Sequence, residues 1–279
     1  MMQPLKLGFI GAGFISKFHT TALQFVREAE LAGVYALDRA EDLRAYSQHC
    51  GTGPCTVYSS VEELCKNVDA ISLNAPNFVR VELMEQIRDA VKAGAELKGI
   101  IIEKPLARSL VEGKRLLELT KEIGVPTAYF ENQIHMKSIK GSLFQLQNEM
   151  KAMGPLALVR SAEEHGGPHE PWFWDPVKQG GGVLSDMGCH SIAVGWYVLT
   201  PPGKPATFLK PVSITAQTAL LKWGQPAMRQ KLLDRTGVDY HKTPADDFAT
   251  GMVTYENPET GQRVMSQFTN SWMYDKQGL

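Results

Sequence analysis

A short apolar strand, a glycine-rich turn and a helical pattern follow one another near the start of the chain, and they constrain its fold more than any other feature. Residues 5–10 read LKLGFI and predict a buried strand, which runs directly into Gly11-Ala12-Gly13-Phe14-Ile15-Ser16. A helical pattern then continues to about Glu28. Glycines in such a turn let the backbone approach a pyrophosphate, whose charge is favoured by the amide groups at a helix N-terminus. We therefore expect four residues of this turn to bind a dinucleotide: Gly11, Gly13, Phe14 and Ile15.

The next predicted strand indicates which dinucleotide is preferred. Residues 31–37 are apolar and lead into Asp38, and an acidic side chain at this place can bond both ribose hydroxyls. Its charge also repels a 2′-phosphate, so NAD is the expected cofactor. Arg39 follows directly and could receive that phosphate, which leaves NADP open as the alternative.

Strands and helices keep alternating up to Phe130 and predict an α/β unit with a doubly wound parallel sheet of six strands. The ligand of such a sheet lies beyond the carboxyl ends of the strands. Asn74-Ala75-Pro76-Asn77 follows one strand end and Glu103-Lys104-Pro105 another. Lys104 could be a solvated loop residue, but Pro105 fixes the backbone after it and the preceding strand is buried. We therefore assign five residues to the cofactor region: Asn74, Pro76, Asn77, Glu103 and Lys104.

The stretch of residues 180–199 is a glycine-rich start followed by an apolar helix that contains Asp186 and His190. Their spacing of i, i+4 puts both side chains on one face of a helix. A carboxylate and an imidazole are costly to bury on an apolar helix unless they pair or meet a polar ligand. Two interpretations therefore stay open, an internally satisfied Asp–His pair and a catalytic pair.

The second half of the chain predicts a helix at residues 143–151 and strands at 156–162, 212–221, 247–255 and 263–272. Between them, residues 163–176 form a loop rich in histidine and tryptophan. Aromatic rings in a loop can stack on a sugar while imidazoles bind its hydroxyls. We expect substrate contacts from His165, Trp172 and Trp174, although Trp174 could instead cover the helix at Gly180. The histidines lack a compact ligand spacing, so no metal is expected.

Composition sets the remaining limits. The 279 residues are 43% hydrophobic and 21% charged, which suits two globular domains, set here at 1–130 and 131–279. A net charge of -1 without a basic block predicts neither nucleic-acid nor membrane partners. The four cysteines show no CxxC spacing, which favours a reducing, cytoplasmic location. No apolar run approaches the roughly 18 residues of a membrane span.

Taken together, these motifs resemble the glucose-fructose oxidoreductase and inositol dehydrogenase (Gfo/Idh/MocA) family over nearly the whole chain. The Glu-Lys-Pro motif joined to a glycine-rich Asp-x-x-x-His helix is more specific than the glycine turn alone. The resemblance implies a dinucleotide-binding Rossmann domain, then an α+β substrate and oligomerisation domain with a large, mostly antiparallel open sheet. It also implies an active site made of Lys104, Asp186 and His190.

The activity implied by this resemblance is that of an NAD(P)-dependent dehydrogenase acting on a CH–OH group of a sugar, inositol or related polyol. His190 is the expected base, Asp186 orients the imidazole or holds a hydroxyl, and Lys104 donates to the reacting oxygen. Lysine is the alternative base if its pKa is depressed. Two other functions stay open: a glycosidase that uses bound NAD for transient oxidation, and a nucleotide sensor without turnover.

Three departures from the family pattern carry further expectations. Arg80 stands where relatives commonly have a histidine, and residues 132–135 lack the arginine that relatives place near the substrate, so His135 is the expected substitute. The chain stops at Leu279 after a long predicted strand, whereas relatives continue. We therefore expect an incomplete second domain whose last strand lies at an exposed edge. A homo-oligomer, dimer or tetramer, is expected through the open sheet face.

Overall fold

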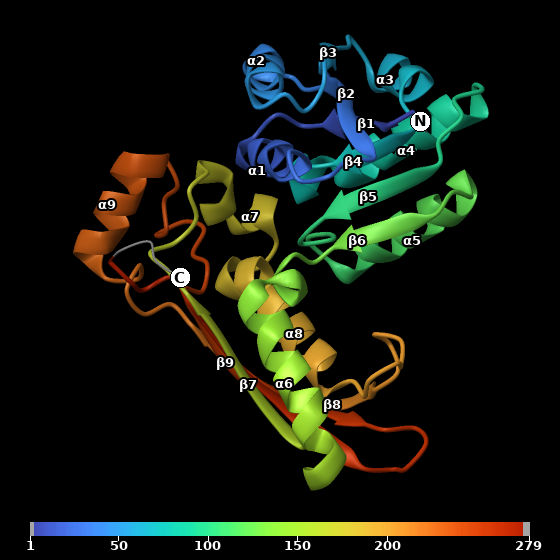
Figure 1. Ribbon diagram of the computed structural model, residues 1–279. Coiled ribbons are helices and arrows are strands. Elements are labelled where there is room, and N and C mark those ends of the chain that lie inside the picture. Colours follow the sequence, from blue (N-terminus) through green and yellow to red (C-terminus); the bar gives the residue numbers. More distant parts are fainter. Residues whose placement is uncertain (1–2, 276–279) are drawn as a thin grey trace. The chain divides into compact units, whose positions relative to one another are not determined.

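The computed structural model of the protein describes residues 3–275, apart from the side chains of residues 147 and 150–153. The chain divides into two compact units, Met1–Phe130 and Glu131–Leu279 (Figure 1). Each unit has its own sheet and its own buried core.

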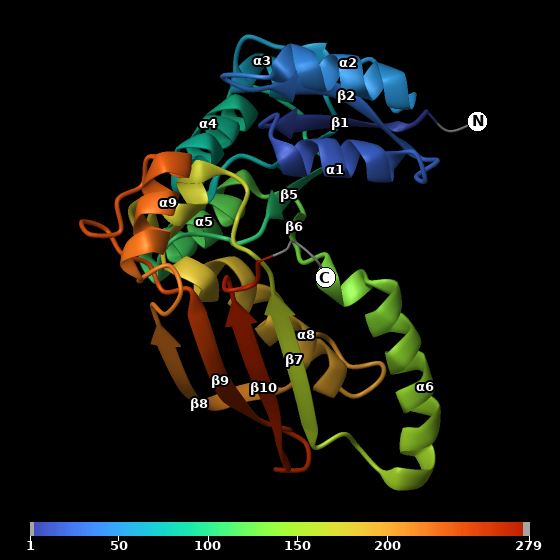
Figure 2. The same ribbon diagram turned by 90° about the vertical axis from the view of Figure 1, so that its left-hand side faces the viewer.

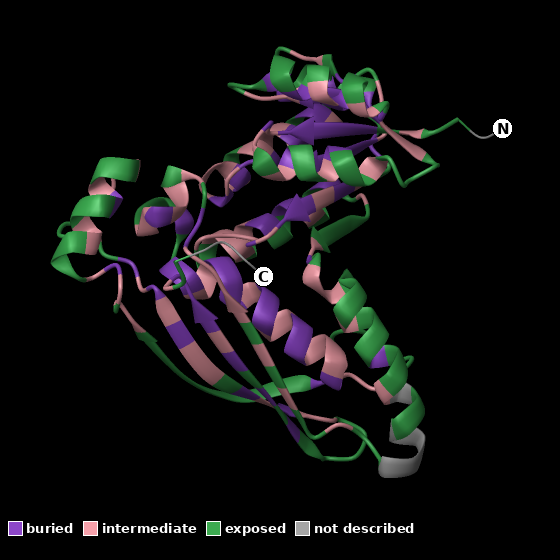
Figure 3. Ribbon diagram, turned by 60° about the vertical axis from the view of Figure 1, so that its left-hand side comes forward, coloured by how far each residue is buried: buried purple, intermediate pink, exposed green. Residues whose placement is uncertain are grey.

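The first unit is built on six parallel strands in the order β3-β2-β1-β4-β5-β6. The strands are β1 (Leu5–Ile10), β2 (Ala29–Tyr35), β3 (Thr56–Val57), β4 (Ala70–Leu73), β5 (Gly99–Glu103) and β6 (Thr127–Phe130). Most of them are buried, which explains their continuous apolar sequences (Figure 3). The strand order changes direction between β1 and β4, the switch point at which doubly wound sheets bind ligands. The predicted α/β class is confirmed.

The helices of the first unit begin and end at recognisable residues. Ser60 and Ser109 accept the N–H groups of Glu63 and Glu112, at 3.1 and 3.3 Å, and so cap α3 and α5. Gly124 ends α5 in the left-handed conformation that glycine tolerates best. The helices are α1 (Phe14–Leu23), α2 (Ala40–Cys50), α3 (Val61–Asn67), α4 (Arg80–Lys92) and α5 (Leu110–Ile123), with the short 3-10 turn η1 (Asn77–Val79).

Two boundaries in the first unit differ from those predicted. Helix α1 ends at Leu23 instead of near Glu28, because the next three N–H groups turn back to carbonyls three residues earlier. Strand β2 ends at Tyr35, so Asp38 lies in the turn after the strand. Leu37 in this turn is 95% exposed, which shows that the apolar run extends beyond the buried part of the strand.

The second unit contains a four-stranded sheet in the order β7-β10-β9-β8. Its strands are β7 (Leu158–Glu164), β8 (Lys210–Ala219), β9 (Phe248–Glu256) and β10 (Arg263–Ser271). β9 pairs antiparallel with β8 and β10, and β7 pairs parallel with β10. Helix α8 (Cys189–Leu199) packs on one face, against β7 and β10 (Figure 2). The α+β class with a mostly antiparallel sheet is confirmed.

The prediction that the last strand lies at a sheet edge is wrong. β10 pairs with β9 on one side and with β7 on the other. The edges are β7 and β8 instead, because β7 enters the sheet in parallel beside β10 and fills the place next to it. Leu279, the residue on which the expectation of an incomplete domain rests, lies outside the described residues.

Besides α8, the described residues of the second unit form six helical segments, of which η2 (Gln133–His135) and η4 (Leu184–Gly188) belong to the candidate site below. The predicted helix at 143–151 is part of the longer α6 (Lys137–Met153). Three segments were not predicted: η3 (Pro171–Trp174), α7 (Pro176–Gln179) and α9 (Pro226–Thr236). In α9 only Leu232 is buried, so the sequence carries little helical periodicity. Among the described residues, no helix combines the length and apolar character needed to cross a membrane.

Candidate active site

The glycine turn after β1 has the backbone geometry that its sequence predicts. Gly11 has a φ of 105°, and a Cβ there would lie 2.9 Å from the backbone N of Ala75 at the end of β4. A Cβ on Gly13 would have nothing within 4 Å. Gly13 is also the N-cap of α1 and provides no side-chain cap for the first N–H groups of the helix. The turn therefore offers open space and helix N–H groups to an anion.

A chain of hydrogen bonds links this glycine turn to strand β4. Ser16 Oγ donates to the carbonyl of Gly11 at 2.7 Å, and Asn74 Nδ2 donates to Ser16 Oγ at 3.2 Å. Ser72 Oγ donates in turn to Asn74 Oδ1 at 2.8 Å. Asn74 was predicted to contact the cofactor, and both of these bonds hold its side chain between Ser16 and Ser72. The serine in the third position of the glycine motif is thus the link between the turn and β4.

The residues present fit a dinucleotide. The positive φ of Gly11, the open space at Gly13 and the uncapped start of α1 together suit a pyrophosphate. Asp38 follows β2 with a side chain that is 75% exposed, and its Oδ2 lies 3.4 Å from Arg39 Nε. Both groups that decide between NAD and NADP are therefore on the surface of the same turn. Pro76 and Asn77 open the turn η1 after β4, as expected for residues at a strand end.

The two glycines of the turn provide a matched test of this arrangement. Gly11→Ala forces a side chain into a left-handed backbone and against Ala75, so we expect lower stability, by about 1–3 kcal/mol, together with loss of NAD binding. Gly13→Ala has room for its methyl group, so we expect near-normal stability and weakened NAD binding. Thermal unfolding and NAD titration of both variants measure this difference. Equal unfolding temperatures for the two variants would contradict it.

The buried Glu103 pairs with the half-buried His19 at the end of β5. His19 Nε2 lies 2.6 Å from Glu103 Oε1, and the N–H of Lys104 donates to Glu103 Oε2 at 2.9 Å. The carboxylate of Glu103 therefore connects α1 to the backbone of Lys104. Glu103 was predicted to lie near the cofactor, and this geometry gives it the supporting task of placing Lys104. His19 was not singled out in the sequence.

Arg80 joins the ends of β4 and β5. Its side chain is 2% exposed, and its Nε donates to the carbonyl of Ala75 at 3.1 Å. The guanidinium also donates to four consecutive carbonyls, those of Glu103, Lys104, Pro105 and Leu106. The arginine at the position of the family histidine thus fixes the backbone on both sides of Lys104.

In the second unit, Asp186 and His190 do not lie on one continuous α-helix. The π-helical turn η4 (Leu184–Gly188) contains Asp186 and leads directly into α8, where His190 is the second residue. Both side chains are buried, and Asp186 Oδ2 accepts a hydrogen bond from Trp272 Nε1 at 3.2 Å. π turns occur frequently at functional sites because they redirect side chains.

The partner of His190 is a residue that the sequence did not reveal. His190 Nδ1 lies 2.6 and 2.8 Å from the two carboxylate oxygens of Glu131, and both side chains are about 5% exposed. Glu131 follows β6 directly, and its Oε1 also accepts the N–H of Gln133 at 2.9 Å. Asp186 was expected either to orient the imidazole or to hold a substrate hydroxyl, and Glu131 is the residue bonded to Nδ1. Its position directly after a predicted strand end was the one available signal.

Cys189 adds a third donor beside this pair. The ligand atoms of Glu131, Cys189 and His190 lie within 4.8 Å of one another, a grouping with the residue types that bind metals. Cys189 Sγ lies 3.3 Å from the carbonyl of Asp186. The sequence predicts no metal, and the loop histidines considered for one are not part of this group.

The four residues predicted to contact substrate lie in different environments, and one of them is in the core. His135 is exposed on the 3-10 turn η2 (Gln133–His135), and His165 Nδ1 accepts the N–H of Gly167 at 3.0 Å. The rings of Trp172 and Phe173 contact each other with centroids 3.8 Å apart and planes tilted by 30°. For Trp174 the substrate contact is wrong and the structural alternative holds, because the side chain is fully buried in the core of the second unit. Its ring packs on those of Trp223, Tyr240 and Trp272.

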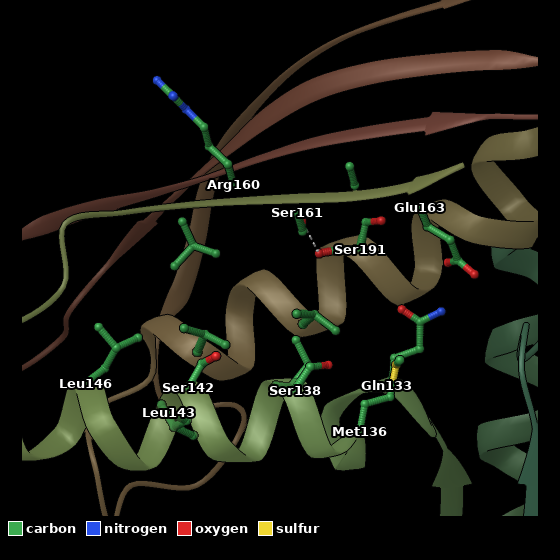
Figure 4. A pocket seen from close by; sticks show the side chains of 15 residues that line it. Gln133, Met136, Ser138, Ser142, Leu143, Leu146, Arg160, Ser161, Glu163 and Ser191 are labelled. Atoms are coloured by element: carbon green, nitrogen blue, oxygen red, sulfur yellow. Dashed lines mark hydrogen bonds between the residues drawn. The ribbon is translucent and has the colours of Figure 1, made fainter. Parts of the chain in front are cut away.

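A cavity of about 400 Å³ lies between α6 and the surface of β7 and α8 (Figure 4). Gln133 and Ser191 line it, and they lie two residues after Glu131 and one residue after His190 in the chain. Figure 4 shows the Arg160 side chain pointing away from the cavity. The cavity is therefore a concave space lined mainly by serines and aliphatic side chains, of a size that suits a small molecule.

The doubly wound sheet and its glycine turn define a dinucleotide-binding protein of the Rossmann type. Residues 5–130 match the family described as an oxidoreductase family with an NAD-binding Rossmann fold, and residues 149–277 match the Gfo/Idh/MocA C-terminal domain. The chain belongs to the Gfo/Idh/MocA family of oxidoreductases. The resemblance seen in the motifs is thereby confirmed, and so is NAD as the cofactor of the first unit.

Similar proteins of this family act on sugars. Glucose-6-phosphate 3-dehydrogenase of Bacillus subtilis (strain 168) is 27% identical over 198 residues, 69% of this chain and 53% of that protein. D-glucoside 3-dehydrogenase of Escherichia coli (strain K12) is 25% identical over 203 residues, 72% of this chain and 55% of that protein. The chain thus spans about half the length of these curated relatives.

A solved structure with a similar fold is that of GenD2 from gentamicin A biosynthesis, in complex with NAD. It has a TM-score of 0.71 and 22% sequence identity, and the match covers 98% of this chain and 67% of that one. At this identity the likeness establishes the fold.

Proposed function

We propose that the protein is an NAD-dependent dehydrogenase that acts on a secondary alcohol of a sugar, inositol or related polyol. The observation that carries the proposal is the buried His190, held by a carboxylate, in a chain whose family binds NAD. The names of the relatives support the substrate class, since they include dehydrogenases of glucose 6-phosphate, D-glucosides and myo-inositol. The cavity beside α8 supports a small-molecule substrate.

Oxidation of an alcohol requires loss of the hydroxyl proton as hydride leaves the same carbon, and NAD supplies the hydride acceptor when bound. His190 accepts the hydroxyl proton, since imidazole is the side chain that changes charge nearest to neutral pH. Lys104 donates to the reacting oxygen and stabilises its developing negative charge. Asp186, which already accepts a bond from Trp272, holds a substrate hydroxyl with its carboxylate.

The test is NADH formation over a panel of sugars, sugar phosphates, inositols and glycosides. Turnover of a sugar or polyol with stoichiometric NADH is the expected result. Glycoside cleavage without net NADH would favour the redox-cycling alternative. Tight NAD binding without turnover of any member would favour the sensor.

We expect the protein to prefer NAD because the exposed Asp38 carboxylate is placed to accept the ribose hydroxyls and repels a 2′-phosphate. The preference is modest, since Arg39 lies beside it. Asp38→Ala should narrow the difference between the dissociation constants for NAD and NADP. Calorimetric titration of both cofactors measures this, with Asp42→Ala on the exposed face of α2 as the control. Tighter NADP binding by the unaltered protein would show that Arg39 governs the pocket.

A homo-oligomer that contacts through the open sheet face is part of the same proposal. Leu158, Met252 and Met265 lie on the face opposite α8, and each is 37–44% exposed. Apolar side chains clustered on an exposed sheet favour a protein contact. A monomeric mass in light scattering would exclude this contact. The four free cysteines support a reducing compartment such as the cytoplasm.

A further inference from the structure

We propose that Glu131 is the positioning residue of His190, and that it holds the imidazole with its proton on Nδ1 so that Nε2 is the proton acceptor. This inference rests on the proposed dehydrogenase function and names the residue on which the base depends. Neither the motifs nor the family match assign a role to Glu131.

The geometry of the pair supports a fixed tautomer. Nδ1 of His190 lies 2.6 and 2.8 Å from the two carboxylate oxygens, which can accept a hydrogen bond but cannot donate one when ionised. The bond therefore requires the proton on Nδ1. In a neutral imidazole, the other nitrogen is then an acceptor.

The carboxylate is itself held in place. Its Oε1 accepts the N–H of Gln133 at 2.9 Å, and the side chain is 6% exposed. A buried carboxylate with fixed partners can orient an imidazole far better than a mobile surface group can. Asp186, the carboxylate suggested by sequence spacing, accepts a bond from Trp272, and the bonds to Nδ1 come from Glu131.

The consequence for catalysis follows from charge. The hydroxyl proton of the substrate moves to Nε2, and the imidazole becomes an imidazolium with a proton on each nitrogen. Its positive charge then lies beside the Glu131 carboxylate. A carboxylate in this position stabilises the charge that forms as the proton is transferred.

The kinetic test replaces the carboxylate by its amide in the full chain. Glu131→Gln should lower kcat by roughly 10²-fold or more while KM and the NAD dissociation constant change little, because a wrong tautomer removes the acceptor without removing binding groups. Glu131→Asp keeps the charge and should recover part of kcat. Glu164→Gln is the matched control. Glu164 lies on the edge strand β7, where its carboxylate accepts a hydrogen bond from Tyr274, and this variant should keep the original kcat. Equal kcat values for Glu131→Gln and the control would overturn the proposal.

A second measurement needs no substrate. Nitrogen NMR of the protein with labelled histidine reports which ring nitrogen carries the proton, and His190→Gln identifies the resonances among the seven histidines. We expect the Nδ1–H form in the original chain and its loss in Glu131→Gln. An Nε2–H form in the original chain would overturn the proposal. The absence of any turned-over sugar would instead contradict only the proposed function, since the tautomer is measured separately.

Metal analysis completes the test, because Cys189 lies beside the pair. The purified protein should contain no stoichiometric metal and should keep its kcat after dialysis against a chelator. A bound metal whose removal abolishes activity would make Glu131, Cys189 and His190 ligands, and the positioning role would be wrong.

Discussion

Replacing His190 by alanine should lower turnover by roughly 10²-fold or more, the usual contribution of a general base, with NAD affinity largely unchanged. The two effects should separate because the glycine turn assigned to NAD belongs to the first unit, whereas His190 lies on α8 of the second. Steady-state kinetics on the identified sugar and NAD titration measure the two quantities. His49→Ala, an exposed histidine in the last turn of α2, is the control.

Lys104→Ala should cause comparable damage, and the double variant should lose less than the product of the two effects. Residues that act on one transition state do not contribute independently. Near-normal turnover in His190→Ala would contradict the assignment of the base. If Lys104→Ala alone removed the basic limb of the pH profile, the base would be the lysine.

Arg80→Met should lower the free energy of unfolding by about 3 kcal/mol, because it leaves a cluster of buried carbonyls without their charged donor. The loss should concentrate where Arg80 binds, so amide hydrogen exchange should accelerate in residues 103–106. Urea unfolding and exchange by mass spectrometry measure the two effects. The stability of Arg80→Lys should fall between that of the unaltered protein and that of Arg80→Met, since a lysine keeps the charge but lacks the planar fork of donors.

The control for Arg80 lies on the same helix. Arg88 of α4 pairs at the surface with Asp89 and Glu122, and exposed ion pairs contribute at most about 1 kcal/mol. Arg88→Met should therefore change stability little and leave exchange at 103–106 unaltered. Equal losses in the Arg80 and Arg88 variants would show that the buried arginine does not hold the Lys104 segment.

The strands of the first unit could be predicted closely because each is marked by a short run of neighbouring residues in the sequence. A strand buried on both faces reads as an unbroken apolar run, so β1 was placed at its correct residues. The bounds of β6, an exposed edge strand, were also predicted correctly. Helix ends were less accurate, since α1 stops where tight backbone turns replace helical bonds, and no glycine or proline marks that place. The order of the second sheet was not readable, because β7 reaches its partner β10 across most of the unit's sequence.

The sequence predicted which residues belong to the candidate site but not the hydrogen bonds that hold them. Lys104, Asp186 and His190 come from motifs, and their roles stay predictions. Glu131 lies 59 residues from His190, and His19 lies 84 residues from Glu103, so only the folded chain brings each pair together. The two alternatives for Trp174 could not be separated, because an aromatic residue in a predicted loop looks the same in sequence whether it faces solvent or core.

The π turn before α8 affects how this chain is compared with others. A π turn holds one residue more per hydrogen-bonded ring than an α turn, so it is equivalent to a single inserted residue. A relative that lacks that residue would form a regular helix and would carry its carboxylate about 100° away around the helix axis. An alignment column shared with Asp186 therefore identifies the same position in space only where the spacing from the glycines to the histidine is also the same. Insertions and deletions in this segment deserve to be weighed as heavily as substitutions when roles are transferred between members of the family.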